Sequence, residues 1–245
     1  MSPRVTLATA GRVLRQLRHD PRTVALLFIV PVALMALVKW VFLGQPLVFQ
    51  RIGVPLVGIF PLTSMFLVTS ITMLRERTRG TLERLMTMPL GKLDLLLGYG
   101  LAFGGVAAAQ ATVVSLVSFR LLDLQVQGVA ALVVAFAVLN AMLGTAFGLF
   151  VSAFAGSEFQ AVQFMPAFLM PQFLLCGLLA PRDRMARGLE IVSDYLPMTY
   201  AYDALRQVAS SDRWSARLSL DLAVLLGVTA AALALGAATL RRRTG

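Results

Sequence analysis

The sequence has few charged residues for its length. Of its 245 residues, only 14% are Asp, Glu, Lys or Arg, whereas 58% are hydrophobic. Water-soluble domains carry about 25% charged residues. We therefore expect an integral membrane protein rather than a soluble domain.

Cysteine and histidine are almost absent, with one of each. Cys176 has no partner for an intrachain disulfide, and its apolar surroundings favour a packing role over a reactive thiol. His19 lies in a basic N-terminal stretch, away from any carboxylate in an apolar run. Since most intramembrane proteases and metallohydrolases need a nucleophile with a base, or paired metal ligands, we expect neither catalytic residues nor a bound metal.

The sequence also lacks the means to power a transporter by itself. A phosphate-binding GxxxxGK[ST] loop is missing, because the only Gly-Lys pair, Gly91-Lys92, is followed by Leu93 and has Met86 at the first glycine position. No ionisable residue lies near the centre of an apolar run, where ion-driven transporters place theirs. We expect this chain to bind no cofactor, and any energy to come from another subunit.

Six apolar stretches are long enough to cross the roughly 30 Å hydrocarbon core of a bilayer. They run from about Val24 to Leu43, Val54 to Leu74, Leu93 to Leu122, Val129 to Phe154, Ala161 to Ala180 and Leu218 to Leu240. They predict an all-α polytopic membrane protein, a single transmembrane domain over residues 1–245 with both termini cytoplasmic. The net charge of +10 fits this topology better than nucleic-acid binding, because more than half of the basic residues fall on the predicted inner side.

Two polar regions flank these spans. Residues 3–22 alternate arginines with apolar residues and predict an amphipathic helix in the membrane interface, a frayed basic tail being the alternative. Residues 181–217, between the fifth and sixth spans, predict two short amphipathic helices broken at Pro197. We expect them to form a re-entrant hairpin that dips into the outer leaflet.

Small and polar residues within the spans indicate how the helices pack. Two GxxxG pairs, Gly100 with Gly104 and Gly144 with Gly148, predict close helix approach. Proline and hydroxyl residues in the second span predict a bent helix inside a bundle. Polar side chains in the spans are candidates to line a translocation path. They are Thr63, Ser64, Thr69, Asn140, Gln163 and Gln172.

The charged segment 75–90, RERTRGTLERLMTMPL, separates the second and third spans and must lie outside the lipid. Thr81 is a suitable N-cap for a short helix, which Pro89 would end. Leu82, Leu85 and Met86 share one face of that helix. The pattern alone leaves two interpretations open: a docking helix for a soluble partner, or a helix resting on lipid headgroups.

Two motifs carry a family resemblance. Glu76, Arg77, Gly80-Thr81-Leu82-Glu83 and Pro89 resemble the ERxxGTLExLxxxP signature of ABC-2-type transporter permeases. Far downstream, LPMTYAYDALR at residues 196–206 resembles that family's LPLTYxxxALR segment. The resemblance covers nearly the whole chain, because the order of the motifs and the hydropathy pattern agree with it.

The resemblance implies a permease subunit of an ATP-driven exporter in a bacterial plasma membrane. Segment 75–90 would be the cytoplasmic coupling region that contacts an ATPase. Its coupling residues would be Glu76, Arg77, Gly80, Thr81, Leu82, Glu83, Leu85 and Met86. Two separate ATP-binding subunits would bind ATP and Mg, and a second copy or a paralogous permease would complete the pathway.

The short predicted outer loops favour a hydrophobic small molecule or lipid-like substrate over a long sugar chain. An alternative function is a membrane-anchored partner-binding or immunity factor that transports nothing. It would share the fold and the docking helix.

Overall fold

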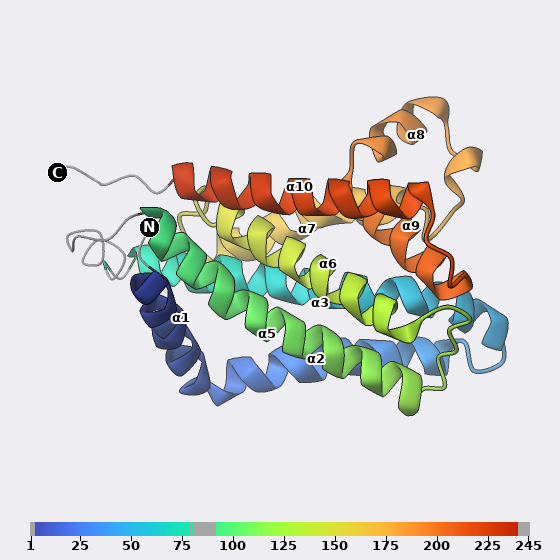
Figure 1. The fold of residues 1–245 in the computed structure, drawn as a ribbon, viewed down its shortest axis with the longest axis horizontal. Helices are drawn as coiled ribbons and strands as arrows, with labels where there is room; N and C mark the ends of the chain where they lie inside the picture. The colour runs from blue at the N-terminus through green and yellow to red at the C-terminus, as the bar shows by residue number, and fades with distance from the viewer. Residues whose placement is uncertain (1–2, 79, 81–91, 240–245) are drawn as a thin grey trace.

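The computed structural model describes residues 3–78, 80 and 92–239 (Figure 1). The described residues form helices and no strand, so the predicted all-α class is confirmed. The elements are α1 (Pro3–Arg18), α2 (Pro21–Val41), α3 (Pro46–Thr78), α5 (Lys92–Arg120), α6 (Ala130–Val151), α7 (Glu158–Leu175), η1 (Arg182–Arg184), α8 (Arg187–Asp194), α9 (Pro197–Ser210) and α10 (Ala216–Ala238).

The long helices lie side by side along the longest axis of the molecule (Figure 1). At one end, which we call the motif end, α3 finishes, α5 begins, α1 starts and α10 finishes. At the other end, the hairpin end, η1, α8 and α9 connect α7 to α10. The described residues of the first motif, 76–78 and 80, and the second motif therefore lie at opposite ends of the bundle.

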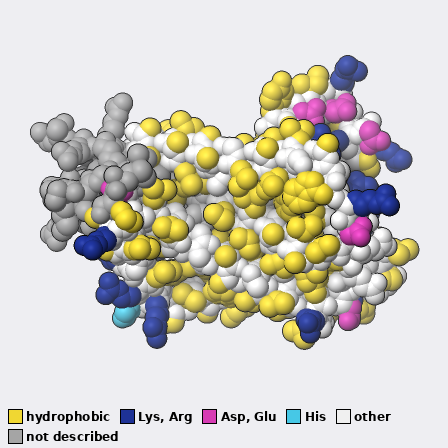
Figure 2. All heavy atoms as spheres, in the orientation of Figure 1, with side chains coloured by type: hydrophobic (Ala, Val, Ile, Leu, Met, Phe, Trp, Pro, Cys, Tyr) yellow, Lys and Arg dark blue, Asp and Glu magenta, His cyan; other side chains and the backbone are white. Residues whose placement is uncertain are grey.

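Among the described residues, five helical segments are long and apolar enough to cross a membrane: α2, α3, residues 97–120 of α5, α6 and α10. Helix α7 occupies most of the predicted fifth span, but it is only 18 residues long and contains Pro166, Pro171 and several glutamines. The number of six spans is therefore not confirmed. Figure 2 shows charged side chains gathered at the two ends of the bundle, with a largely hydrophobic band between them.

The core is centred on α3 and α6, which pack closely at two glycines of α6. A Cβ atom on Gly144 would lie 2.1 Å from the Leu62 carbonyl oxygen, and one on Gly148 would lie 2.0 Å from Thr69 Oγ1. The close approach predicted for this GxxxG pair is confirmed. The prediction for the other pair is wrong within this chain, because Gly100 has no such neighbour within 4 Å and Gly104 has only Met142 Cε at 3.9 Å.

The structure also changes the predicted second span. Residues 44–53, which separate the first two predicted spans and were expected to form an outer loop, are mostly helical, because α3 begins at Pro46, and proline is favoured at the start of a helix. With 33 residues, α3 is about 50 Å long and extends beyond the hydrocarbon core of a bilayer. It is the helix that connects the hairpin end with the first motif.

The hairpin contains two helices separated just before Pro197, as predicted. Helix α9, however, packs its apolar face against α3, α6 and α10, so that Met198 and Leu205 are fully buried. This face therefore contacts protein, whereas we had expected it to dip into the outer leaflet. Helix α8 differs, because Leu189, Ile191 and Val192 are each about half exposed.

Candidate functional site

Glu76, the first residue of the first motif, lies in a buried junction where α1, α3 and α5 meet at the motif end. Only 3% of its side chain is exposed. Its carboxylate accepts hydrogen bonds from Arg12 Nη1 at 3.3 and 3.5 Å. Arg12 Nη2 also donates to the hydroxyl of Tyr99, and the Arg12 guanidinium lies 5.6 Å from the centre of the Tyr99 ring. We call these three residues the α1–α3–α5 junction.

The packing of α1 on α5 places Arg12 in this junction. Thr9, Ala10 and Val13 form the buried face of α1. A Cβ atom on Gly98 would lie 2.6 Å from Thr9 Cβ and 2.9 Å from the Thr6 carbonyl oxygen. The glycine therefore allows the two helices to approach closely, and this approach brings the Arg12 side chain to Glu76.

A second ion pair connects α3 to α7. Arg75 Nε donates to Glu158 Oε1 at 2.7 Å, and Arg75 Nη2 donates to Oε2 at 2.9 Å. Helix α7 begins at this carboxylate, with Ser157 as a side-chain N-cap that accepts from the Gln160 backbone N–H. Neighbouring residues of α3 therefore attach its end to α1 and α5 on one side and to α7 on another.

Gly80 follows the end of α3 with a φ of +71°, and its backbone N–H donates to the Arg77 carbonyl oxygen at 3.4 Å. Glycine adopts this left-handed conformation without the steric cost of a Cβ atom, and it commonly ends helices in this way. The motif glycine thus turns the chain out of α3. The remaining predicted coupling residues lie outside the described part of the chain. They are Thr81, Leu82, Glu83, Leu85 and Met86.

The structure does not bring the candidate path residues to one surface. The Thr63 and Ser64 hydroxyls donate to the Phe60 carbonyl oxygen within α3, and Thr69 is buried where α3 packs on α6. The hydroxyls of Thr63, Ser64 and Thr69 therefore bond carbonyl oxygens of α3 itself.

The three amide side chains of the candidate path are also separated from one another. Asn140 is fully buried on α6, and its side-chain nitrogen lies next to Gly58 of α3. Neither polar atom of its side chain has a hydrogen-bond partner among the described residues. Gln172 is buried on α7, whereas Gln163 on the same helix is exposed.

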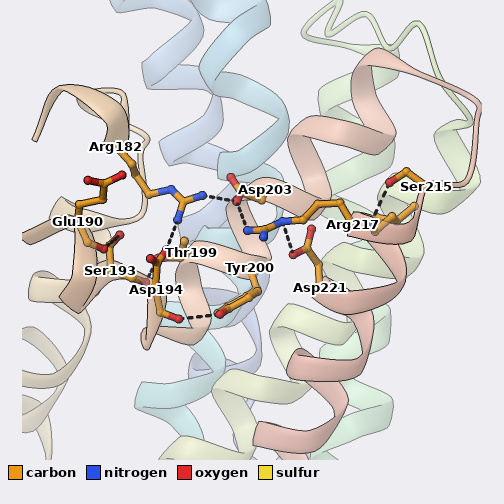
Figure 3. Close-up of polar contacts among 11 residues, drawn as sticks. Arg182, Glu190, Ser193, Asp194, Thr199, Tyr200, Asp203, Ser215, Arg217 and Asp221 are labelled. Atoms are coloured by element: carbon orange, nitrogen blue, oxygen red, sulfur yellow. Dashed lines mark hydrogen bonds and ion pairs between the residues drawn. The ribbon is translucent and has the colours of Figure 1, made fainter. Parts of the chain in front are cut away.

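The hairpin end contains a network of alternating arginines and carboxylates (Figure 3). Arg182 pairs with Asp194 at 2.9 Å and with Asp203 at 2.7 Å. Asp203 also accepts from Arg217 at 3.2 Å, and Arg217 Nε lies 3.4 Å from Asp221 Oδ1. The network connects η1 and α8 through α9 to the first turns of α10. We call these five residues the hairpin network.

The second motif forms α9 and positions this network. Pro197 is the first residue of α9, and Thr199 Oγ1 donates to the Ser193 carbonyl oxygen at 2.7 Å. Tyr202 packs beside Gly177, whose φ of +100° turns the chain after α7. Burial raises the pKa of Tyr202, which keeps its hydroxyl neutral.

Sequence reasoning missed several residues of both sites. For Arg217 and Asp221, a spacing of four residues within a helix was a usable signal. Arg12, Tyr99 and Glu158 gave no such signal, because their partners are distant in sequence. The described residues contain no group of three or more His, Cys, Asp or Glu side chains that could hold a metal ion.

Comparison with known proteins identifies the family. A family model described as ABC-2 type transporter matches residues 4–209, which is most of the chain. The chain belongs to this family. The match includes the α1–α3–α5 junction and α9, which carries the second motif, and it ends before α10. The family predicted from the two motifs is thereby confirmed.

Relatives of this ABC-2 chain are similar to part of it. The probable multidrug ABC transporter permease YbhR of Escherichia coli K12 is 27% identical over 157 residues, which cover 64% of this chain and 43% of that protein. ABC transporter G family member 20 of Dictyostelium discoideum is 26% identical over 141 residues, covering 58% of this chain and 19% of that protein. The chain therefore matches less than half of the length of either relative.

Proposed function

We propose that this chain is the permease subunit of an ATP-driven exporter that moves a hydrophobic small molecule or lipid-like substrate outward. The observation that carries the proposal is the attachment of the α3 end to three other helices. Arg75 and Glu76 make these attachments directly before segment 81–91, which contains the expected docking residues. A partner that displaces this segment would move α1, α5 and α7 together with α3.

The buried state of Glu76 favours such mechanical coupling. Separating a buried carboxylate from its arginine costs more than separating an exposed pair, because the charges must be left without partners or be rehydrated. Arg12 and Glu76 therefore favour motion of α1 and α3 as one body. Family membership and the multidrug permease named among the relatives support a transport function.

In this proposal two separate ATP-binding subunits bind ATP and Mg, and each docks on segment 75–90 of one permease chain. A second copy of this chain, or a paralogue, forms the other half of the pathway. The chain itself performs no catalysis. The motif end lies in the cytoplasm of a bacterial cell, with α7 as a sixth membrane crossing and both termini inside.

The orientation can be tested by cysteine labelling in intact cells. Tyr195 is 83% exposed at the hairpin end, and Leu7 is 66% exposed at the motif end. Cys176 is fully buried and contributes little background. A membrane-impermeant maleimide should label Tyr195→Cys from outside and Leu7→Cys only after the membrane is permeabilised. The opposite pattern would refute the orientation.

The coupling role can be tested by replacing Leu82 and Leu85 together with Asp. Three apolar side chains can stabilise a docking contact at about 25 cal/mol per Å² of buried apolar area, and unpaired charge would oppose it. We expect the double variant to lose its ATP-binding subunits in a pull-down and to lose ATP-driven substrate movement in vesicles. A matched control replaces Leu43 and Leu121 with Asp, both exposed and located just after the ends of α2 and α5.

Two outcomes would contradict the proposal. If the double variant still captured the ATP-binding subunits and still supported transport, segment 81–88 would be a helix resting on lipid headgroups that transmits no motion from an ATPase. Normal capture by the unchanged chain without substrate movement would favour a membrane-anchored partner-binding or immunity factor.

A further inference from the structure

A cavity of about 560 Å³ opens between α1, α2 and α3 near the motif end. Its volume lies within the roughly 300–1,000 Å³ usual for small-molecule and cofactor sites. Along α3 it extends from Ser64 to Arg75, a length of about 16 Å at 1.5 Å per residue. That length is close to the depth of one leaflet, which is about half of the 30 Å hydrocarbon core.

The polarity of the cavity changes along its length. Apolar side chains form most of the wall, with Leu26, Leu27 and Val30 from α2 facing Leu67 and Val68 from α3. The charged side chains that line the cavity, Asp20 and Arg75, lie at its end nearer the motif end, and we call this end of the cavity the mouth.

The hydroxyl at the opposite end of the cavity along α3, on Ser64, donates to the Phe60 carbonyl oxygen, and so it is already satisfied. This arrangement fits a ligand with a long apolar chain and a polar head.

The chain turns between α1 and α2 at this mouth, and the turn is basic. Arg15, Arg18 and Arg22 are exposed, and none of them forms an ion pair with a carboxylate of the described residues. Asp20 accepts from the Thr23 backbone N–H and from its hydroxyl, so its carboxylate is occupied in capping α2. Basic groups at a membrane surface attract anionic lipid headgroups.

We propose that this cavity binds one acyl chain of an anionic phospholipid from the cytoplasmic leaflet, with the phosphate at Arg18 and Arg22. The leaflet assignment rests on the proposed orientation, whereas the binding itself does not. The bound lipid would lie between α1, whose Arg12 pairs with Glu76, and Arg75, which pairs with Glu158. It would therefore contact elements on both sides of the proposed coupling point.

The arginines at the mouth distinguish this occupant from a second copy of the chain. A helix of another copy could fill the apolar wall, but it would leave three cations without partners at the mouth. A phospholipid supplies the apolar chain and the anion in one molecule, at the depth that the cavity has.

The proposal can be tested with the full chain in phosphatidylcholine nanodiscs that contain phosphatidylglycerol with a photoactivatable acyl tail. Crosslinked peptides are mapped by mass spectrometry. We expect adducts concentrated in residues 23–30 and 64–75, and competed by unlabelled phosphatidylglycerol but not by phosphatidylcholine. Leu67→Trp should fill the cavity and reduce these adducts severalfold. Leu226→Trp, at a half-exposed leucine of α10, is the matched control and should leave them unchanged.

A second variant tests the proposed contacts between the arginines and the lipid headgroup. Arg18→Gln with Arg22→Gln should weaken the competition by phosphatidylglycerol about tenfold or more, because each arginine near a membrane surface strengthens binding to anionic lipid by roughly fivefold. Arg120→Gln with Arg213→Gln, exposed at the hairpin end, should not.

Adducts spread evenly over the exposed helices, or unaffected by Leu67→Trp, would overturn the proposal. Chain-to-chain adducts at the cavity would show that a second copy occupies it and would also overturn the proposal. Because the readout is lipid binding, failure here is distinguishable from failure of ATP-driven transport.

Discussion

The motif end and the hairpin end both depend on arginine–carboxylate pairs, but these pairs bridge very different lengths of chain. Arg12 and Glu76 are 64 residues apart, and Arg75 and Glu158 are 83 apart. In the hairpin network, Arg182 and Asp194 are only 12 residues apart, and Asp203 and Arg217 are 14 apart. The motif end therefore exists only when distant helices have assembled, whereas the hairpin end is held together by neighbouring elements.

The carboxylates that join the most helices at each end also differ in burial. The Glu76 side chain is 3% exposed, whereas Asp203 is 20% exposed and its neighbour in the network, Asp194, is 59% exposed. Asp221, at the α10 side of the hairpin network, is fully buried. Charges near water are screened and contribute little. A change in the α1–α3–α5 junction should thus affect the whole bundle, and a change at Asp203 or Asp194 should stay local.

The largest effect is expected from Glu76→Gln. The amide keeps the shape of the side chain but leaves the partly buried Arg12 without its counter-charge. We expect the free energy of unfolding to fall by about 1–3 kcal/mol, the range for losing one partner of a buried charged hydrogen bond. Chemical unfolding of the purified chain in detergent measures it. Glu190→Gln, in α8, is the matched control and should change little.

A double-mutant cycle with Arg12→Met separates the pair from other effects of the substitution. We expect the two changes to be non-additive by at least about 0.5 kcal/mol, because the residues are in contact. Additive effects would mean that the pair does not stabilise the α1–α3–α5 junction.

Asp203→Asn should have the next largest effect, confined to the hairpin end. It weakens two ion pairs at once, because Arg182 and Arg217 share this carboxylate. We expect faster hydrogen exchange in residues 182–203, by about fivefold for a loss of about 1 kcal/mol. Exchange in α1 and α5 should not change. Asp212→Asn, at an exposed position, is the control, and faster exchange throughout the bundle would refute the difference between the two ends.

The sequence was sufficient for the family, the helical class and the position of the hairpin break. Hydropathy gives long apolar helices directly, and Pro197 marks the break because proline is favoured in the first turn of a helix, where it stands in α9. It was not sufficient for the predicted fifth span, because α7 is 18 residues long and contains two prolines and several glutamines. The sequence also could not distinguish the two GxxxG pairs, because the spacing of the glycines does not show which of the two helix faces packs against another helix.

The candidate site was predicted only in part. The motif identified Glu76, but the residue type does not reveal that Arg12 and Tyr99 enclose it. Such contacts depend on how α1 crosses α5, which is a tertiary property. Local signals, such as the spacing of Arg217 and Asp221, survive in the sequence because one helix sets the geometry.

Arg75→Gln should have a small effect and would sharpen the comparison between buried and exposed pairs at the motif end. The Arg75 and Glu158 side chains are 41% and 51% exposed. We expect a loss of about 0.5 kcal/mol or less in the free energy of unfolding, which shrinks further in high salt. Unfolding at low and high ionic strength measures it. A loss as large as that of Glu76→Gln would mean that burial does not separate the two pairs.

The smallest effect concerns Asp20, the N-cap of α2. Hydrogen bonds from the Thr23 hydroxyl and backbone N–H lower the pKa of Asp20 below its ordinary value of 3.8. Because the folded-state pKa is lowered, the stabilisation is present above the pKa of the unfolded chain and is lost as pH falls through the lowered value. Amides in the first turn of α2 should therefore lose protection from hydrogen exchange only at acidic pH, after correction for the intrinsic exchange rate. Asp20→Asn should keep the cap without this pH dependence, since asparagine caps helices about as well as aspartate. Equal pH dependence in both proteins would show that another group controls the start of α2, and that the turn leading to the cavity is not held by this cap.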